Sequence, residues 1–343
     1  MNDVTNISKQ SPPRLAPSPV QNYNGIDLIK LICSFLICII HIDPFPVNER
    51  TFPIIFYLQQ CICRIAVPFY FSVTGFLLFR TAYASSFESK AKEFIFRILR
   101  LYGLWLILLF WGSTIQLWYL PASVVAVMLL YVCYRLRLKQ KTIGILALLL
   151  FLFGLLGGCY GFLLKYIKKV FVIYYPVKAY VAFFETTRNG IFFGFPFVFL
   201  GAALASRKKE MKLQTAVAGL IASLAFMVLE VSFLKKFSGS LNYEYYISLL
   251  PAAYFLLQLA RGIRLKDKPI FKKLRTISFL VYCTHLFVSR TAYMALSFFK
   301  KFTGINLLSF HFLITIILVF GISALIVQLS QKPRFKWLRW LYR

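Results

Sequence analysis

The sequence has few acidic residues and few histidines for its length. Its 343 residues include 11 Asp and Glu and 3 His against 40 Lys and Arg, which gives a formal charge of +29. The sequence also lacks a Walker phosphate-binding loop and a Gly-x-Ser-x-Gly nucleophile motif, so two common classes of soluble enzyme are excluded. Its 7 cysteines lie in or beside apolar runs without the spacing of metal ligands. We therefore expect packing cysteines and no metal site.

Long apolar runs are the main feature that is present. Hydrophobic residues make up 59% of the chain and aromatic residues 18%. Runs of roughly 20 apolar residues recur, which is the length that a helix needs to cross about 30 Å of hydrocarbon. We therefore predict an all-α, polytopic membrane protein with about ten transmembrane helices. The expected spans lie near residues 26–43, 53–79, 98–118, 121–134, 143–163, 190–206, 213–234, 244–260, 276–299 and 306–330.

The basic residues gather on one side of these spans. If the N-terminus is cytoplasmic, most of the 40 Lys and Arg lie in internal segments and few lie in external loops. The positive-inside rule thus predicts that both termini are cytoplasmic and that the protein is a multi-pass protein of the cell (plasma or inner) membrane. Membrane lipids and topology then explain the positive charge, and we expect no nucleic-acid partner.

Three regions follow from this pattern. Residues 1–22 are polar and contain proline, without the apolar segment of a signal peptide, and we expect a disordered cytoplasmic tail. Residues 23–331 form the transmembrane domain, and residues 332–343 form a basic cytoplasmic tail. The external segment 160–189 is rich in aromatic residues and lysine. Either it holds an extracytoplasmic acceptor as a re-entrant or capping loop, or it is a plain connector.

The first span carries, on one face, three ionisable side chains whose burial in a bilayer costs free energy. Lys30 and His41 are eleven positions apart, so they point within about 20° of each other and lie about 16 Å apart along the helix. Asp27 falls near the same line. Such a stripe is expected to face the bundle interior or a wet cavity. The alternative is that Asp27 and Lys30 neutralise each other at the inner surface while His41 reaches the outer headgroups.

Other spans bring further ionisable or flexible positions. Arg64 and His285 lie within spans, which is hard to explain by surface snorkelling alone. His285 is either catalytic or a hydrogen-bonded structural residue. The second span also contains Pro68 and the pair Thr74 and Gly75, which allow a kink and a close backbone approach, although Gly75 also fits a simple packing role.

Three arginines at the ends of spans have two interpretations each. Arg97 and Arg100 open the third span from the cytoplasmic side on one face, which suits the phosphates of a soluble donor or simple positive-inside anchoring. Arg188 lies at the outer mouth, where it would meet an anionic acceptor or serve only at a helix entry.

The order of several motifs resembles a known family. The motifs are Asn24-Gly25-Ile26-Asp27 followed by Lys30 and His41, then RIAVPFYFSVTGFLLF, FIFRILRLYGLW, TRNGIFFGFPFVFLGAAL and ISFLVYCTHLFV. Together they resemble the acyltransferase 3 family of integral membrane acyltransferases, in the branch that includes the membrane module of vancomycin-resistance serine racemases. The likeness runs from Asn24 to the last span. The proline usual after the arginines of the third span is absent, and Gly103 stands near its place.

The resemblance implies an enzyme that moves acyl groups, other than aminoacyl groups, from cytoplasmic acyl-CoA to envelope glycans or other envelope molecules. It makes His41 the catalytic histidine, puts Lys30 in place of a family arginine and puts Thr74 in place of a family serine. Acetyl-CoA is then a donor substrate, with no permanently bound cofactor. The predicted catalytic set is Asp27, Lys30 and His41, and the predicted substrate-binding set is Arg64, Thr74, Arg97, Arg100, Arg188 and His285.

The chemistry of acyl transfer suits these residues. A base must take the hydroxyl proton, and positive charge or hydrogen-bond donors must stabilise the oxyanion. An unperturbed imidazole serves as a base near neutral pH, and His41 would act either directly or as a transient acyl-imidazole. Two other functions stay open: a small-solute or amino-acid carrier, as the racemase-linked relatives suggest, and a membrane scaffold without catalysis. No racemase segment follows the last span, so we expect such a carrier to act by transport alone.

Overall fold

The computed structural model describes residues 23–42, 53–80, 84–110, 114–207, 210–237 and 244–343, and all regular structure within these ranges is helical. The predicted disordered tail, residues 1–22, lies outside the described residues. In chain order the α-helices are α1 (Asn24–His41), α2 (Pro53–Tyr57), α3 (Ala66–Arg80), α4 (Ala84–Leu108), α5 (Tyr119–Arg135), α6 (Gln140–Leu156), α7 (Phe171–Phe184), α8 (Phe195–Ala205), α9 (Leu213–Phe237), α10 (Leu249–Gly262), α11 (Pro269–Thr303) and α12 (His311–Leu329).

The helices confirm an all-α, multi-pass membrane protein. In the described part of the chain, 5 helical segments are long and apolar enough to cross a bilayer: Asn24–His41, Ile54–Arg80, Ile115–Arg135, Leu213–Phe237 and Leu308–Leu329. Three shorter apolar helical segments accompany them: Gln140–Leu156, Phe171–Phe184 and Gly190–Ala205. The number of crossings and the cytoplasmic side of the termini stay predictions.

Two expected segments differ from the structure. The span expected at 98–118 is wrong in its bounds, because α4 already begins at Ala84 and the chain from Ile115 to Trp118 forms a 3₁₀ turn that leads into α5. Helix α4 starts early because its polar first part is also a good helix former, with Lys92 2.8 Å from Glu88 one turn away. Segment 160–189, predicted to be external, contains a 3₁₀ turn and α7, so the expected loop includes a helix, while its role as a capping loop or a plain connector stays a prediction.

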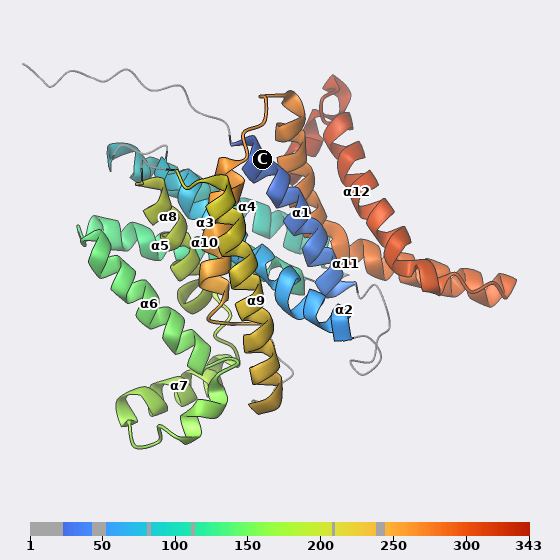
Figure 1. The fold of residues 1–343 in the computed structure, drawn as a ribbon. Coiled ribbons are helices and arrows are strands. Elements are labelled where there is room, and N and C mark those ends of the chain that lie inside the picture. Colours follow the sequence, from blue (N-terminus) through green and yellow to red (C-terminus); the bar gives the residue numbers. More distant parts are fainter. Residues whose placement is uncertain (1–22, 43–52, 81–83, 111–113, 208–209, 238–243) are drawn as a thin grey trace, which may run out of the picture.

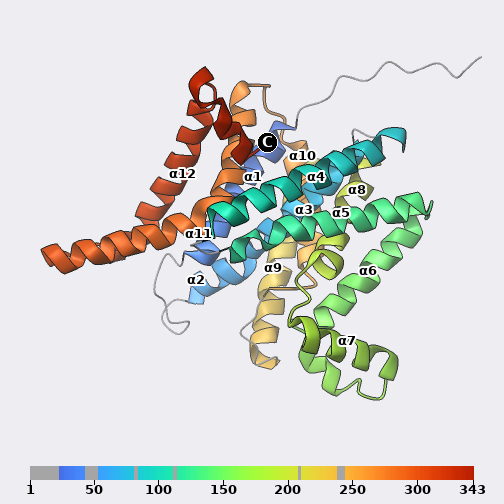
Figure 2. The ribbon, with the colours of Figure 1, turned by 180° about the vertical axis from the view of Figure 1, so that it is seen from behind.

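Helix α1 lies inside the bundle, where it packs against α3, α10 and α11 (Figure 1). Helices α11 and α12 pair along one side, and α5, α6 and α7 form the opposite side. Figure 2 shows α4 running alongside α5 across the back of the molecule. The arrangement encloses Asp27 and Lys30 among other helices, whereas His41, at the end of α1, is exposed.

Helices α3 and α8 cross at two glycines. A Cβ atom on Gly75 would lie 1.8 Å from the carbonyl oxygen of Val198, and one on Gly201 would lie 1.8 Å from that of Ser72. Only glycine permits such a backbone approach, as in the small-residue interfaces of membrane helices. The close approach predicted at Gly75 is thus confirmed, and it fixes α3 against α8.

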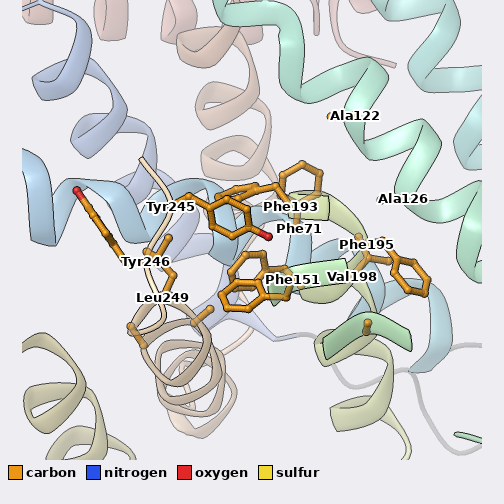
Figure 3. Packing of buried hydrophobic residues seen from close by; sticks show 14 of the residues in the cluster. Phe71, Ala122, Ala126, Phe151, Phe193, Phe195, Val198, Tyr245, Tyr246 and Leu249 are labelled. Atoms are coloured by element: carbon orange, nitrogen blue, oxygen red, sulfur yellow. The ribbon is translucent and has the colours of Figure 1, made fainter. Parts of the chain in front are cut away.

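An aromatic core holds the segment that precedes α10 (Figure 3). The ring of Tyr245 packs edge-on against Phe193 at 4.9 Å and against Phe151 at 5.1 Å between centroids. The Tyr245 hydroxyl donates a hydrogen bond to the carbonyl of Phe192. Edge-to-face contacts of this kind favour one fixed arrangement of the rings. The residue before Tyr245, Glu244, is therefore held in a defined place.

Candidate active site

An inner cavity opens at the end of the bundle where α1 begins. We call this end, predicted to be cytoplasmic, the inner end, and we call the end with His41 the outer end. The inner cavity has a volume of about 310 Å³. Its polar lining comprises the basic residues Lys30, Arg97 and Arg275, the tyrosines Tyr70, Tyr119, Tyr282 and Tyr342, and the hydroxyl residues Thr74, Ser123, Thr276 and Ser278.

An outer pocket lies at the other end of the same face of α1. It is small, about 40 Å³, and its polar lining comprises His41, Arg64, Gln116, Trp118, Arg188 and Glu244. Four residues, Ile37, Val67, Tyr119 and Tyr282, line both the inner cavity and the outer pocket. The two spaces are thus separated by one layer of side chains.

The stripe of α1 faces these spaces. Lys30 lines the inner cavity, Ile37 lies in the shared wall, and His41 lines the outer pocket. The predicted common face of Lys30 and His41 is therefore confirmed. No hydrogen bond to the His41 ring occurs within the described residues, and its recorded ring contact is with His285.

Asp27 pairs with a residue of another helix. Arg275 of α11 donates two hydrogen bonds to it, from Nε to Oδ1 at 2.8 Å and from Nη2 to Oδ2 at 2.8 Å. The Asp27 side chain is 4% exposed, and this bidentate pair joins the inner ends of α1 and α11. The structure therefore gives Asp27 a tethering contact with Arg275, and a catalytic role for its carboxylate stays a prediction.

His285 of α11 lies beside His41. The ring centroids are 5.3 Å apart with an angle of 40° between the planes. Nδ1 of His285 lies 2.9 Å from the carbonyl oxygen of Tyr282 and 3.2 Å from that of Val281. A carbonyl accepts only, so Nδ1 carries the proton and Nε2 is an acceptor. That Nε2 atom is buried and has no hydrogen-bond partner in the described part of the chain.

The outer pocket holds a cluster of three charged side chains. Glu244 Oε1 lies 2.5 Å from Arg188 Nη1 and 3.5 Å from Arg64 Nη1. Gln60 fixes Arg64 by accepting from its Nε at 3.2 Å and its Nη2 at 2.9 Å. Arg188 also lies over the ring of Trp118, 4.7 Å from its centroid. Burial lowers the pKa of Arg188 and Glu244 opposes that shift, so the guanidinium stays charged.

Three irregular helical turns lie next to the arginines of this pocket. The π-helical turn Leu58–Ile62 and the 3₁₀ turn Cys63–Ile65 interrupt the helix before α3 and carry Arg64. The π-helical turn Gly190–Gly194 follows Arg188 and is capped by Asn189, whose side chain accepts from the backbone N–H groups of Ile191 and Phe192. Single π turns often occur at functional sites because they redirect side chains.

The remaining predicted residues lie at the inner end. Thr74 and Arg97 line the inner cavity, and the Thr74 hydroxyl donates to the carbonyl of Tyr70 at 3.0 Å. Arg100 is not among the cavity residues; it lies over the Trp340 ring at 5.2 Å and donates to the backbone carbonyl of Arg343. The structure thus brings Arg64, Arg188 and His285 to His41 at one end, and Thr74, Arg97 and Lys30 together at the other.

The C-terminal segment helps to enclose the inner cavity. It forms a 3₁₀ helix, Pro333–Leu341, which packs beside α4 and α12. Trp105 Nε1 donates to the carbonyl of Leu341 at 3.0 Å, and the hydroxyls of Ser330 and Tyr342 lie 2.7 Å apart. Tyr342 thereby reaches the cavity lining. These contacts attach the predicted basic tail to the bundle.

Sequence reasoning missed several lining residues. Glu244 and Arg275 each meet a partner far away along the chain, and Gln116 and Trp118 lie in a 3₁₀ turn that apolar periodicity assigned to a span. Tyr119 and Tyr282 look like ordinary apolar-span aromatics. For Glu244, the sequence signal was the rarity of acidic residues, 11 in the whole chain, which marks each Asp or Glu as a candidate site residue.

Comparison with known proteins agrees with the membrane architecture. A family model described as an acyltransferase domain matches residues 23–328. The chain is similar to an amino-acid racemase of Enterococcus faecalis, at 26% identity over 282 residues that cover 75% of this chain and 38% of that protein. It is also similar to a serine/alanine racemase of Enterococcus gallinarum, at 25% identity over 336 residues that cover 89% of this chain and 46% of that one.

The chain thus spans less than half the length of these relatives. No solved structure shows a significant similarity to it. The family match nevertheless covers nearly all of the helical bundle, including the whole lining of the outer pocket and all of the inner cavity lining except Tyr342. The chain therefore belongs to the acyltransferase 3 family of membrane acyltransferases.

Proposed function

We propose that the chain moves an acyl group, which we take to be acetyl, from cytoplasmic acyl-CoA to a hydroxyl of an extracytoplasmic glycan or other envelope molecule. The observation that carries this proposal is the pair of spaces at opposite ends of one helix face, with His41 in the outer one and a single layer of side chains between them. We place the protein in the plasma or inner membrane, with acyl-CoA as a substrate and not a resident cofactor.

The inner cavity suits the donor. Lys30 and Arg97 line it without an ion pair in the described part of the chain, and they offer positive charge to phosphate groups. Its volume of about 310 Å³ lies at the lower end of the range for ligand pockets, roughly 300–1,000 Å³. This space supports binding of the acyl-carrying arm, with the nucleotide portion of CoA held outside the mouth.

The shared wall suits the passage of the thioester. Ile37 and Val67 supply apolar surface, while the hydroxyl of Tyr119 lies 3.3 Å from that of Thr74. Movement of one side chain in this layer would join the two spaces and bring a thioester carbonyl from the inner cavity to His41. Such a small movement accords with side-chain rotamer changes on fast timescales.

The proposed reaction balances without a metal or redox step. A nitrogen of His41 accepts the proton of the acceptor hydroxyl, and the hydroxyl oxygen of the acceptor forms a bond to the thioester carbonyl carbon. Tyr119 and Arg64, which line the outer pocket together with His41, are the donors that we assign to the developing oxyanion. The carbon–sulfur bond then breaks, the thiolate takes the proton back from His41, and CoA leaves as the thiol. A transient acyl-imidazole on His41 gives the same net reaction in two steps.

Replacement of His41 tests this proposal. The His41→Ala protein should release no CoA from labelled acetyl-CoA in the presence of a cell-envelope extract, while the wild type should release CoA only when the extract is present. His311→Ala is a matched control, because His311 contacts the carbonyl of Ser289 at 2.9 Å and is absent from the lining of both spaces. Transfer retained in His41→Ala would remove this residue from the mechanism.

A second candidate is a carrier for a small solute such as an amino acid. It is favoured by the names of the racemase relatives and by cavities that enter from both ends. Reconstituted protein that takes up labelled serine without CoA release would support the carrier. CoA release that depends on an acceptor would support the enzyme.

A further inference from the structure

The outer pocket carries more positive charge than negative charge. Among the described residues that line it, Arg64 and Arg188 share a single carboxylate, that of Glu244. Both guanidiniums approach the same oxygen, Oε1, at 3.5 Å and 2.5 Å. Within the described lining, one positive charge therefore remains without a counter-charge. This excess is distinct from the cations of the inner cavity, which lie beyond the shared wall.

The two guanidiniums are held in place before any substrate binds. The side chains of Arg64 and Arg188 are 17% and 28% exposed, so both are largely removed from solvent. Gln60 orients one and the Trp118 ring supports the other. A guanidinium has five N–H donors, and the contacts on each side leave some of them unused. A partly buried cation with free donors is stabilised by an anion at close range.

We infer that the acceptor carries an anionic group, a carboxylate or a phosphate, beside the hydroxyl that receives the acyl group. This inference rests on the proposed acyl transfer. His41 lines the same small pocket as the two arginines, so one molecule can place its hydroxyl at the imidazole and its anionic group at Arg64 and Arg188. Arginine binds carboxylate and phosphate through paired hydrogen bonds, which also orients the acceptor.

Chemical treatment of the acceptor tests the inference and separates the two anionic groups. Wild-type protein in lipid vesicles is offered labelled acetyl-CoA and cell-envelope extract in three forms. One portion is untreated, one has its carboxylates converted to amides with carbodiimide and ethanolamine, and one has its phosphate esters removed with hydrofluoric acid. We expect one of the two treatments to abolish labelling, which assigns the group as carboxylate or phosphate. Labelling that survives both treatments would overturn the inference.

Variants of the pocket provide an independent test with the untreated extract. Arg188→Gln should raise the extract concentration needed for half-maximal labelling about ten-fold, the effect of losing one charge-assisted contact, with the KM for acetyl-CoA unchanged. Glu244→Gln should lower that concentration, because it frees both arginines for the acceptor. Arg290→Gln, which replaces an exposed arginine outside the pocket lining, is the matched control and should change neither value.

The opposite directions expected for Arg188→Gln and Glu244→Gln distinguish binding from structural damage, because simple loss of an ion pair would weaken both variants alike. Equal weakening in both would contradict the inference. If Glu244→Gln fails to fold, Arg188→Gln and the treated extracts still decide the question. Failure of the proposed function has a different result: the untreated extract would not be labelled by the wild type above the level of His41→Ala.

Discussion

His41 and His285 lie with their ring centroids 5.3 Å apart, and Nε2 of His285 is buried without a hydrogen-bond partner among the described residues. Helix α11 fixes His285 through its Nδ1 proton, which the carbonyls of Val281 and Tyr282 accept. The structure holds no hydrogen bond between the two described rings; if they approach to hydrogen-bond distance when substrate binds, the Nε2 acceptor of His285 would hold the His41 imidazole in one tautomer, in the way that a third group orients the base in other acyl-transfer sites.

Replacement of His285 by Asn should separate this positioning role from a structural one. The Asn amide can keep the hydrogen bond to the carbonyls but removes Nε2. We expect kcat to fall by about 10–100-fold, within the range for acid–base assistance, with unchanged melting temperature and unchanged KM for acetyl-CoA. The pH dependence of kcat should also shift, since the partner of His41 is lost. A variant that melts early and keeps a wild-type pH profile would show that His285 is only structural.

Substitution of the glycines at the α3–α8 crossing should destabilise the protein. Gly75→Ala or Gly201→Ala puts a methyl group 1.8 Å from a backbone carbonyl oxygen, so the helices must separate. We expect a loss of about 1–3 kcal/mol or more of stability, measured as a lower melting temperature in detergent. Gly103→Ala in α4 is the control, because no atom lies within 4 Å of its added Cβ. Equal stability of all three variants would contradict the close crossing.

The Asp27–Arg275 pair should contribute to stability more than to chemistry. Asp27→Asn leaves Arg275 without its carboxylate, and we expect a loss of about 1–3 kcal/mol, less than for a fully buried pair because Arg275 is 52% exposed. Thermal unfolding of Asp27→Asn, Arg275→Gln and the double variant should show strong coupling between the two positions. A kcat as low as that of His41→Ala, without any change in unfolding, would instead favour the catalytic role predicted from the sequence.

Donor binding should depend on Arg97 more than on Arg100. Arg97→Gln removes a cation from the lining of the inner cavity, whereas Arg100 contacts Trp340 and the C-terminal segment. We expect the KM for acetyl-CoA to rise about ten-fold in Arg97→Gln, the effect of one lost charge-assisted phosphate contact, and less in Arg100→Gln. Steady-state kinetics at varied acetyl-CoA and fixed extract measure both values. The reverse order would place the donor phosphates nearer to the C-terminal segment.

Local patterns in the sequence were sufficient to predict most helices and the common face of Lys30 and His41 on α1. Apolar runs identify most helices because the bilayer fixes their length, and the eleven-residue spacing of Lys30 and His41 fixes their common face by helical geometry alone. The beginning of α4 was missed because its first turns are polar, so hydropathy carries no signal there.

The charged cluster could not be predicted because its members meet across long separations. Within the outer cluster, Arg64 and Glu244 are separated by 180 positions. The separate pair at the inner end, Asp27 and Arg275, is separated by 248 positions. No periodicity within one helix links such residues, and only the packing of α1 against α11 and the aromatic core before α10 brings them together. The π-helical turns are equally hard to predict, because no periodicity in their sequences, LQQCI and GIFFG, marks a π turn.

Because of the π-helical turns, the positions of the side chains in the outer pocket depend on the number of residues in the segments that carry them. The π-helical turn Leu58–Ile62 takes up more residues than an α-helical turn, so loss of one residue from it would rotate the helix before it by about 100° relative to Arg64. A deletion there would disturb the pocket even if every charged side chain were kept, whereas a conservative apolar exchange would not.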